Sequence, residues 1–234
     1  MIIKGKIKDK TSVVLFIFIL AAVGLGVYSN TIKKSAVDHS RIPGKVELSK
    51  GYQRWITNIK NKDFKVDTKD FELKEENEVY NSKWVKVYSL EEPGIREQLG
   101  TVLAQLKDVD KVVFSPSGRE LLDYRNTLRD GYNTNEVRFY GQKEDKVLDA
   151  RILDCSIRTN CYFDRAYFLD NDVFVISELS RAVDKKDLNF PICLVSDACE
   201  YTFKEHLIDL INNKRYVYES KPFTITLTDV LTKL

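Results

Sequence analysis

The chain has 234 residues, of which 43% are hydrophobic and 31% are charged, and this composition excludes both a disordered tail and a polytopic membrane protein. Its 37 Lys and Arg nearly balance its 35 Asp and Glu, so a generally basic nucleic-acid binder is excluded and we expect no nucleic-acid partner. Two His in the whole chain disfavour histidine-rich metal chemistry, and we expect no metal and no cofactor.

An uncharged run of 22 residues, 11–32, follows a short basic tail formed by residues 1–10. As a helix, this run would extend about 33 Å, which matches a hydrocarbon core about 30 Å thick. The sequence therefore predicts one transmembrane helix over 11–32, in contact with membrane lipid. The side chains expected to anchor it are Val13, Leu15, Phe16, Ile17, Phe18, Ile19 and Leu20.

The alternative to a retained anchor is a cleaved signal peptide, with Val27-Tyr28-Ser29 as the cleavage site. The run is long for a signal peptide and has no Ala-x-Ala, so we expect retention. Lys residues flank both sides of the run, so the positive-inside rule does not set its orientation. The short N-terminal tail and the position of all four Cys in the C-terminal part favour a cytoplasmic N-terminus. We expect a single-pass protein of the cell membrane whose C-terminal domain lies outside the cytoplasm.

Residues 33–50 are expected to form a basic juxtamembrane linker, and residues 51–234 an exported β-rich domain. Residues 31–65 carry nine basic and three acidic side chains, whereas residues 66–110 carry six basic and eleven acidic ones. Such charge runs are typical of solvated surfaces, and a basic run beside a membrane also attracts anionic headgroups. The sequence leaves both interpretations open.

Short alternating runs rich in Tyr, Phe, Val, Ile and Thr, separated by polar turns, predict an antiparallel β domain with minor helix. The expected strands are 64–66, 71–73, 84–89, 112–114, 120–124, 137–140, 147–153, 162–169, 173–178, 192–195, 206–211, 216–219 and 223–227. Helices are expected around 53–59 and 228–234, and residues 94–107 fit either a helix or a strand.

Two stretches repeat a strand–turn–strand plan, residues 112–126 and 166–179, and each is followed by a further hairpin, at 136–148 and 206–218. The segment Phe114-Ser115-Pro116-Ser117-Gly118-Arg119-Glu120-Leu121-Leu122 resembles the Phe-Ser-Pro-Asp-Gly segment of β-propeller repeat proteins. His206–Ile211, followed by Asn212-Asn213-Lys214, resembles the outer hairpin of such a blade. The resemblance implies antiparallel blades and no particular activity. We expect a partial propeller-like domain or a two-sheet sandwich.

The four Cys form two equally spaced pairs, Cys155 with Cys161 and Cys193 with Cys199. Outside the cytoplasm this pattern favours two disulfides, and local pairing is the simplest connectivity. Four free thiols or a zinc site of four thiolates are the alternatives, although five intervening residues exceed the usual zinc-ligand spacing.

His206 is the one His expected in the folded domain, and a buried structural histidine is its ordinary role. The sequence contains no catalytic or nucleotide-binding motif, so we assign no catalytic residue. We expect a binding or envelope-organising module that contacts a protein or cell-surface partner. The alternative function is a membrane-anchored hydrolase that uses carboxylates near His206.

Overall fold

The computed structural model describes residue 19 and residues 39–62, 64, 66–79, 85–129, 132–156, 158, 160–182 and 193–228. Residues 40–234 form a compact unit of their own. Among the described residues, no helix is both long enough and apolar enough to cross a membrane. The predicted tail and transmembrane segment, apart from Ile19, lie outside the described residues.

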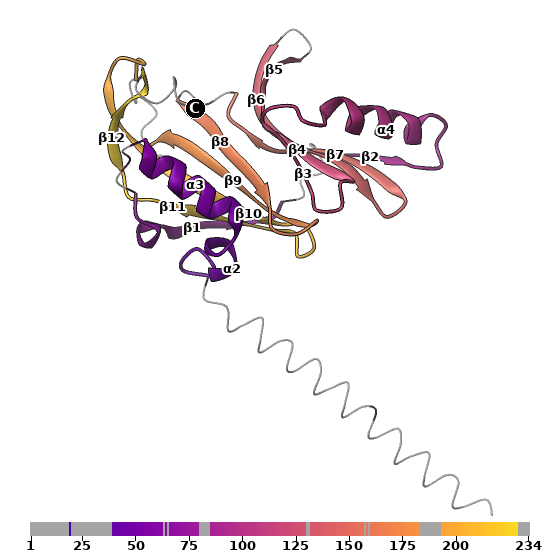
Figure 1. Ribbon diagram of the computed structural model, residues 1–234, viewed down its shortest axis with the longest axis horizontal. Helices are drawn as coiled ribbons and strands as arrows, with labels where there is room; N and C mark the ends of the chain where they lie inside the picture. Colours follow the sequence, from indigo (N-terminus) through magenta and orange to yellow (C-terminus); the bar gives the residue numbers. More distant parts are fainter. Residues whose placement is uncertain are drawn as a thin grey trace, which may run out of the picture. The chain divides into compact units, whose positions relative to one another are not determined.

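The predicted antiparallel β domain is confirmed, and its strands form two sheets (Figure 1). Sheet A has the order β1-β11-β10-β9-β8, with β12 also paired to β10. Its strands are β1 (Glu72–Asn77), β8 (Cys161–Phe168), β9 (Val173–Arg181), β10 (Ala198–Asp209), β11 (Lys214–Glu219) and β12 (Phe223–Thr226). Sheet B has the order β2-β7-β6-β4-β3, with β5 also paired to β6. Its strands are β2 (Val85–Ser89), β3 (Val112–Phe114), β4 (Glu120–Asp123), β5 (Asn126–Arg129), β6 (Tyr132–Lys143) and β7 (Lys146–Asp154).

The two hairpins predicted for each repeated unit lie in one sheet. In sheet A, β8, β9, β10 and β11 follow one another as an antiparallel meander, and in sheet B β3, β4, β6 and β7 do the same. The β10–β11 turn is tight because Asn213 adopts a left-handed φ of 53°, a conformation that Asn tolerates. One strand from earlier in the chain extends each sheet: β1 pairs with β11 in sheet A, and β2 pairs with β7 in sheet B.

Three hydrophobic layers hold the sheets and helices together. The amphipathic helix α3 (Lys50–Asn61) buries Tyr52, Trp55, Ile56 and Ile59 against one face of sheet A. The opposite face of sheet A packs against sheet B, where the rings of Phe139 and Phe174 stack with centroids 6.0 Å apart.

The outer face of sheet B is covered by α4 (Ile95–Leu106), which resolves the ambiguous segment 94–107 as a helix. Residues 53–59 are likewise helical within α3, as predicted. Two short helices, α2 (Gly44–Glu47) and the 3₁₀ turn η1 (Thr68–Asp70), were not predicted. Helix α2 and the first residue of α3 fall inside the segment expected to be a linker.

The strand predicted for residues 192–195 is wrong over its described part. Residues 193–195 lie in a loop, closed by a backbone hydrogen bond of 3.0 Å from Asp197 to Leu194. The side chains of Leu194 and Val195 are 62% and 49% exposed, so their apolar character does not reflect a buried strand. Of the segment 64–66, the described residues Phe64 and Val66 are not in a strand. The predicted C-terminal helix falls outside the described residues except for Thr228.

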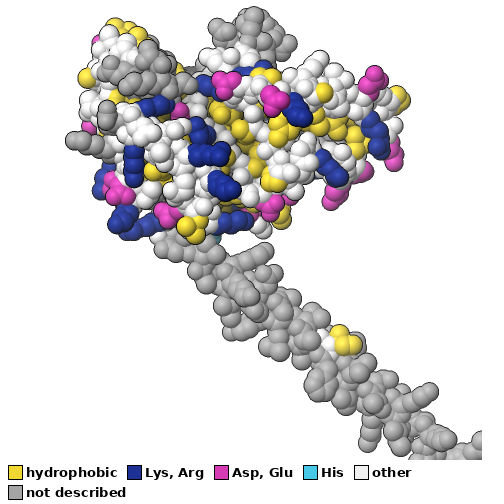
Figure 2. Space-filling view, viewed as in Figure 1, with side chains coloured by type: hydrophobic (Ala, Val, Ile, Leu, Met, Phe, Trp, Pro, Cys, Tyr) yellow, Lys and Arg dark blue, Asp and Glu magenta, His cyan; other side chains and the backbone are white. Residues whose placement is uncertain are grey.

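One face of the domain has apolar side chains at its surface. Figure 2 shows a strip of hydrophobic side chains across the middle of this face, bordered by Lys and Arg. This face therefore presents apolar and basic side chains beside one another.

Candidate functional site

The two predicted cysteine pairs lie at disulfide distance, and the pairing is the local one. Cys155 and Cys161 connect the end of β7 to the start of β8, with Cα atoms 5.5 Å apart. Cys193 and Cys199 close an exposed loop before and within β10, with Cα atoms 6.4 Å apart. The first pair is buried in the layer between the sheets, so the two clips differ in environment although their spacing is identical.

His206 lies on β10 beside a carboxylate that the sequence analysis did not identify. Its Nε2 atom is 3.1 Å from Oε2 of Glu178 on the neighbouring strand β9. The residues are buried, with exposed fractions of 5% for His206 and 0% for Glu178. A carboxylate accepts hydrogen bonds and donates none, so a neutral His206 donates from Nε2.

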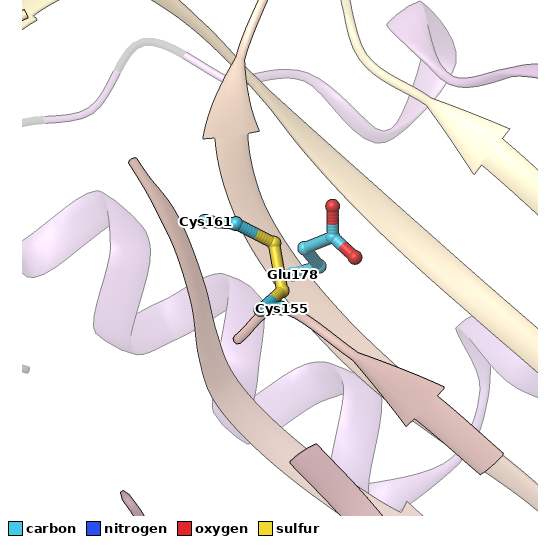
Figure 3. Close-up of side chains that lie close together, drawn as sticks. All are labelled: Cys155, Cys161 and Glu178. Carbon is cyan, nitrogen blue, oxygen red and sulfur yellow. A yellow bond between two sulfur atoms is a disulfide. The ribbon is translucent and has the colours of Figure 1, made fainter. Parts of the chain in front are cut away.

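Arg158 neutralises Glu178 from the loop between the paired cysteines. Its guanidinium donates two hydrogen bonds to the two carboxylate oxygens, at 3.0 and 2.9 Å. The same Nη2 atom lies 3.2 Å from Sγ of Cys155. Figure 3 shows the Glu178 carboxylate beside the bond between Cys155 and Cys161. The disulfide therefore holds the loop that supplies the counter-charge of Glu178.

The environment fixes the charge of each group in this cluster. Burial raises the pKa of Glu178, but the hydrogen bond from His206 and the guanidinium of Arg158 outweigh that effect and lower the pKa well below its ordinary value. Burial lowers the pKa of His206 despite the neighbouring carboxylate. At neutral pH the cluster therefore contains an ionised Glu178, a charged Arg158 and a neutral His206.

A cavity of about 290 Å³ adjoins the cluster, between the inner face of sheet A and the end of β7. Its basic side chains are Arg158, Lys204 and Arg215, and its acidic ones are Glu75, Asp154 and Glu219. Lys204 lies 4.0 Å from Glu219, and Arg215 lies 3.9 Å from Glu75. The cavity wall is thus close to neutral, and its charges already have partners of opposite sign.

The chemistry available at this cavity is limited. A neutral His206 beside an ionised carboxylate has the form of a general base, and among the described residues its Nδ1 makes no hydrogen bond. However, no Ser, Thr or Tyr is among the described residues that line the cavity. The nearby sulfur atoms of Cys155 and Cys161 are bonded to each other and are not thiolates. The described residues that line the cavity therefore supply no hydroxyl or thiolate nucleophile.

The disulfide between Cys155 and Cys161 also determines whether these residues can bind a metal ion. Ligand atoms of Cys155, Cys161 and Glu178 lie within 4.8 Å of one another, which is compatible with a bound cation. Cys binds zinc through a thiolate sulfur, and the sulfur atoms of a disulfide are not thiolates. In the disulfide-bonded chain these three residues do not fit a metal ion.

A second polar cluster joins the turns of the two repeated units. The backbone N–H of Ser117 donates to Oδ1 of Asn171 at 2.9 Å, which links the β3–β4 turn of sheet B to the β8–β9 turn of sheet A. Glu120 accepts a hydrogen bond of 2.6 Å from Oγ of Ser117 and pairs with Lys143 at 3.3 Å. Lys143 also pairs with Asp172. Because these charges compensate one another across the sheets, the cluster is a structural tie.

Arg158 and Glu178 are the residues that sequence reasoning missed. Glu178 is the single charged residue of the run Val173–Leu179, and a lone charge in a buried strand is a signal for a paired charge. Arg158 lies in the middle of a segment bracketed by Cys, but its contact across to β9 depends on how the sheet folds. The sequence alone contains no signal for that contact.

Searches for similar proteins found no match to the chain among protein-family models, curated proteins or solved structures.

Proposed function

We propose that this protein is a single-pass membrane protein whose domain from residue 40 onward lies outside the cytoplasm and works as a binding module. The observation that carries the proposal is the local pairing of all four cysteines at disulfide distance. Disulfides persist in oxidising compartments and are rare in the cytosol. The uncharged segment 11–32 supplies the anchor, and residues 33–39 separate it from the domain in the chain.

Binding rather than hydrolysis is supported by the chemistry around His206. The carboxylate that meets it is buried and already accepts hydrogen bonds from Arg158, and the described cavity wall has no hydroxyl or thiolate nucleophile. Such a cluster resembles a buried structural ion pair more than an acid–base site. We also propose that the two meanders are related to propeller blades, on the basis of their strand order and their Ser-Pro-Ser-Gly and Asn-Asn-Lys turns.

A membrane-impermeant maleimide tests the location. The native chain in intact cells is expected to react only after reduction, because all its thiols are paired. A Lys86→Cys variant places a thiol at an exposed position of β2 and should react without reductant. A matched Lys8→Cys variant places a thiol in the N-terminal tail and should react only once the membrane is opened. The reverse pattern for the two variants would overturn the proposal.

The hydrolase stays as a second candidate because His206 does meet a carboxylate beside a cavity. His206→Gln keeps a side-chain N–H that can donate to Glu178 but removes the titrating ring. If the full chain hydrolyses any nitrophenyl ester or glycoside, and this variant loses that activity while its melting temperature is unchanged, then the hydrolase is correct. The binding proposal predicts no such activity in either protein.

A further inference from the structure

A basic cleft lies between α3, the loop before β3, and β8. Its volume is about 400 Å³, and it lies apart from the cavity beside His206. One stripe of α3, formed by Gly51, Arg54 and Asn58, lines the cleft together with the C-cap residue Lys62, while the neighbouring stripe of the helix is buried against sheet A. The same helix thus builds the core with one face and the cleft wall with another.

The charges in the cleft are unequal. Four basic side chains line it, and they come from three separate segments of the chain: Arg54, Lys62, Lys111 and Arg165. The two acidic side chains are Asp110 and Asp164. The cleft therefore has an excess of two positive charges at neutral pH.

The acidic residues are engaged locally. Asp164 accepts a hydrogen bond of 2.9 Å from Nε1 of Trp55 and lies 4.0 Å from Nζ of Lys62. Oδ1 of Asp110 accepts a hydrogen bond of 3.0 Å from the backbone N–H of Lys111. Within the part of the chain that the structure describes, no carboxylate lies within 4.0 Å of the charged nitrogens of Arg54, Lys111 or Arg165.

Unpaired basic groups in a concave site attract and hold anions. Lys111 and Arg165 are half-buried, so their charges are less screened than those of fully exposed side chains. Arg presents a planar fork of N–H donors that matches the oxygens of a phosphate group, and two such forks border this cleft. Figure 2 shows the Lys and Arg side chains gathered beside the hydrophobic strip of this face.

We infer that the cleft between α3, Lys111 and β8 binds a phosphate group, held by Arg54, Lys111 and Arg165. This inference deepens the proposed binding function and rests on it. The phosphate has two possible sources with the same chemistry: the headgroup of an anionic phospholipid or a soluble phosphorylated compound. The excess of two positive charges suits a phosphate group, which has one negative charge as a diester and about two as a monoester at neutral pH.

The test is isothermal titration calorimetry of the purified full chain with inorganic phosphate, in detergent and at low ionic strength. Arg54→Gln with Arg165→Gln is expected to weaken the binding by about tenfold or more, because two charged donors are lost. Lys111→Asn is a second variant. Asn tolerates the left-handed φ of 58° at this position, so the loop is retained while the charge is removed. It should weaken binding in the same direction.

A matched control removes two charges elsewhere. Lys86→Gln with Lys146→Gln changes two exposed positions of sheet B and should leave phosphate binding unchanged. Equal weakening in the control and in the cleft variants would overturn the inference, because the binding would then follow net charge alone. Undetectable binding of phosphate to the native chain would also overturn it.

The source of the phosphate is distinguished by reconstituting the full chain into nanodiscs. If the ligand is a headgroup, inorganic phosphate should bind in phosphatidylcholine discs and bind more weakly in an equal mixture of phosphatidylcholine and phosphatidylglycerol. If the ligand is soluble, the two discs should give the same affinity. Both results support the cleft. Failure of the cleft leaves the maleimide result intact, whereas a cytoplasmic location overturns the proposed function whatever the phosphate titration shows.

Discussion

The indole Nε1 of Trp55 donates a hydrogen bond of 2.9 Å to Oδ2 of Asp164, and this contact ties α3 to β8. The register of β8 against β9 shifts between Phe163 and Arg165, so Asp164 lies at a local irregularity of the strand. Trp55 itself is fully buried and packs edge-on against Phe203, with centroids 5.5 Å apart. One aromatic residue thus combines core packing with the positioning of an acidic residue of the cleft.

Trp55→Phe should destabilise the domain by about 1–3 kcal/mol, because the ring packing is largely retained while the hydrogen bond to a partly buried carboxylate is lost. The measurement is urea unfolding of the full chain in detergent, followed by far-ultraviolet circular dichroism. Asp164→Asn keeps a side-chain oxygen acceptor and should cost less. If Trp55→Phe were as stable as the native chain, the hydrogen bond between Trp55 and Asp164 would not contribute to the stability of the fold.

Gly51 and Gly100 both lie within helices, but alanine should affect them in opposite directions. A Cβ on Gly51 would lie 2.3 Å from ring atoms of Tyr167, whereas a Cβ on Gly100 would meet no atom within 4 Å. Gly51→Ala should cost about 1–3 kcal/mol by overpacking, and Gly100→Ala should stabilise α4 by roughly 0.5–1 kcal/mol. Thermal unfolding of the two variants tests this, and a stabilised Gly51→Ala variant would show that α3 packs less closely on β8.

Two buried glutamates on neighbouring strands of sheet A should respond oppositely to replacement by Gln. Glu178 is ionised, and its pKa is lowered by His206 and Arg158 against the effect of burial. Burial raises the pKa of Glu205 well above its ordinary value, although the hydroxyl of Ser177 opposes the rise, so Glu205 is protonated in the fold. Glu178→Gln should cost about 1–3 kcal/mol at pH 7, since it removes the charged partner of Arg158, whose side chain is 43% exposed and therefore keeps some hydration, whereas Glu205→Gln should stabilise by about 1–3 kcal/mol.

The two pKa shifts also predict how the effect of each substitution on stability changes with pH. A carboxyl with a lowered pKa stabilises the fold above its unfolded pKa, and that stability is lost as the pH falls, so the cost of Glu178→Gln should shrink in acid. A carboxyl with a raised pKa makes the fold less stable as the pH rises above its unfolded value, by up to about 1.4 kcal/mol per pH unit. The gain from Glu205→Gln should therefore grow from pH 4 to pH 7. Changes of the same sign in both variants, measured by urea unfolding, would contradict these charge states.

The two disulfides should contribute unequally. Closing a seven-residue ring contributes about 2 kcal/mol by chain entropy in each case. Replacing both Cys193 and Cys199 by Ser should cost about that amount, because the loop between them is exposed and, of the two Cys, only Cys193 is fully buried. Replacing both Cys155 and Cys161 by Ser should cost more, since two hydroxyls enter the layer between the sheets and Arg158 is released from its position. Equal losses in melting temperature would mean that the position of Arg158 does not depend on the clip.

The strands were predictable where local pattern and turn chemistry agree. Val112–Phe114 was predicted at its observed bounds, and the β10–β11 turn was predicted from Asn212-Asn213-Lys214. Residues 192–195 failed because an apolar run inside a small closed loop has the composition of a strand without its burial. Helix α2 is a single turn, too short for a hydrophobic period to reveal it.

The candidate sites were less predictable than the fold. The sequence indicated the cysteine pairing, because its two partners are close in the chain. The contact between Glu178 and His206 depends on the register of β9 against β10, in which Glu178 stands opposite Lys204 and His206 opposite Ile176. The cleft requires α3, β8 and the loop before β3 to come together, and no local pattern encodes that meeting.

The pairing of β1 with β11 has a consequence for how the chain is made. Glu72 stands opposite Glu219, so a strand near the start of the domain finds its partner only when the chain is available as far as residue 219. A chain that emerges N-terminus first must leave β1 unpaired until β11 has appeared, and contacts of such long sequence separation form slowly. The sequence of β1, Glu-Leu-Lys-Glu-Glu-Asn, is rich in charged side chains. Charge on an unpaired strand discourages pairing with other chains, which protects β1 until β11 has been made.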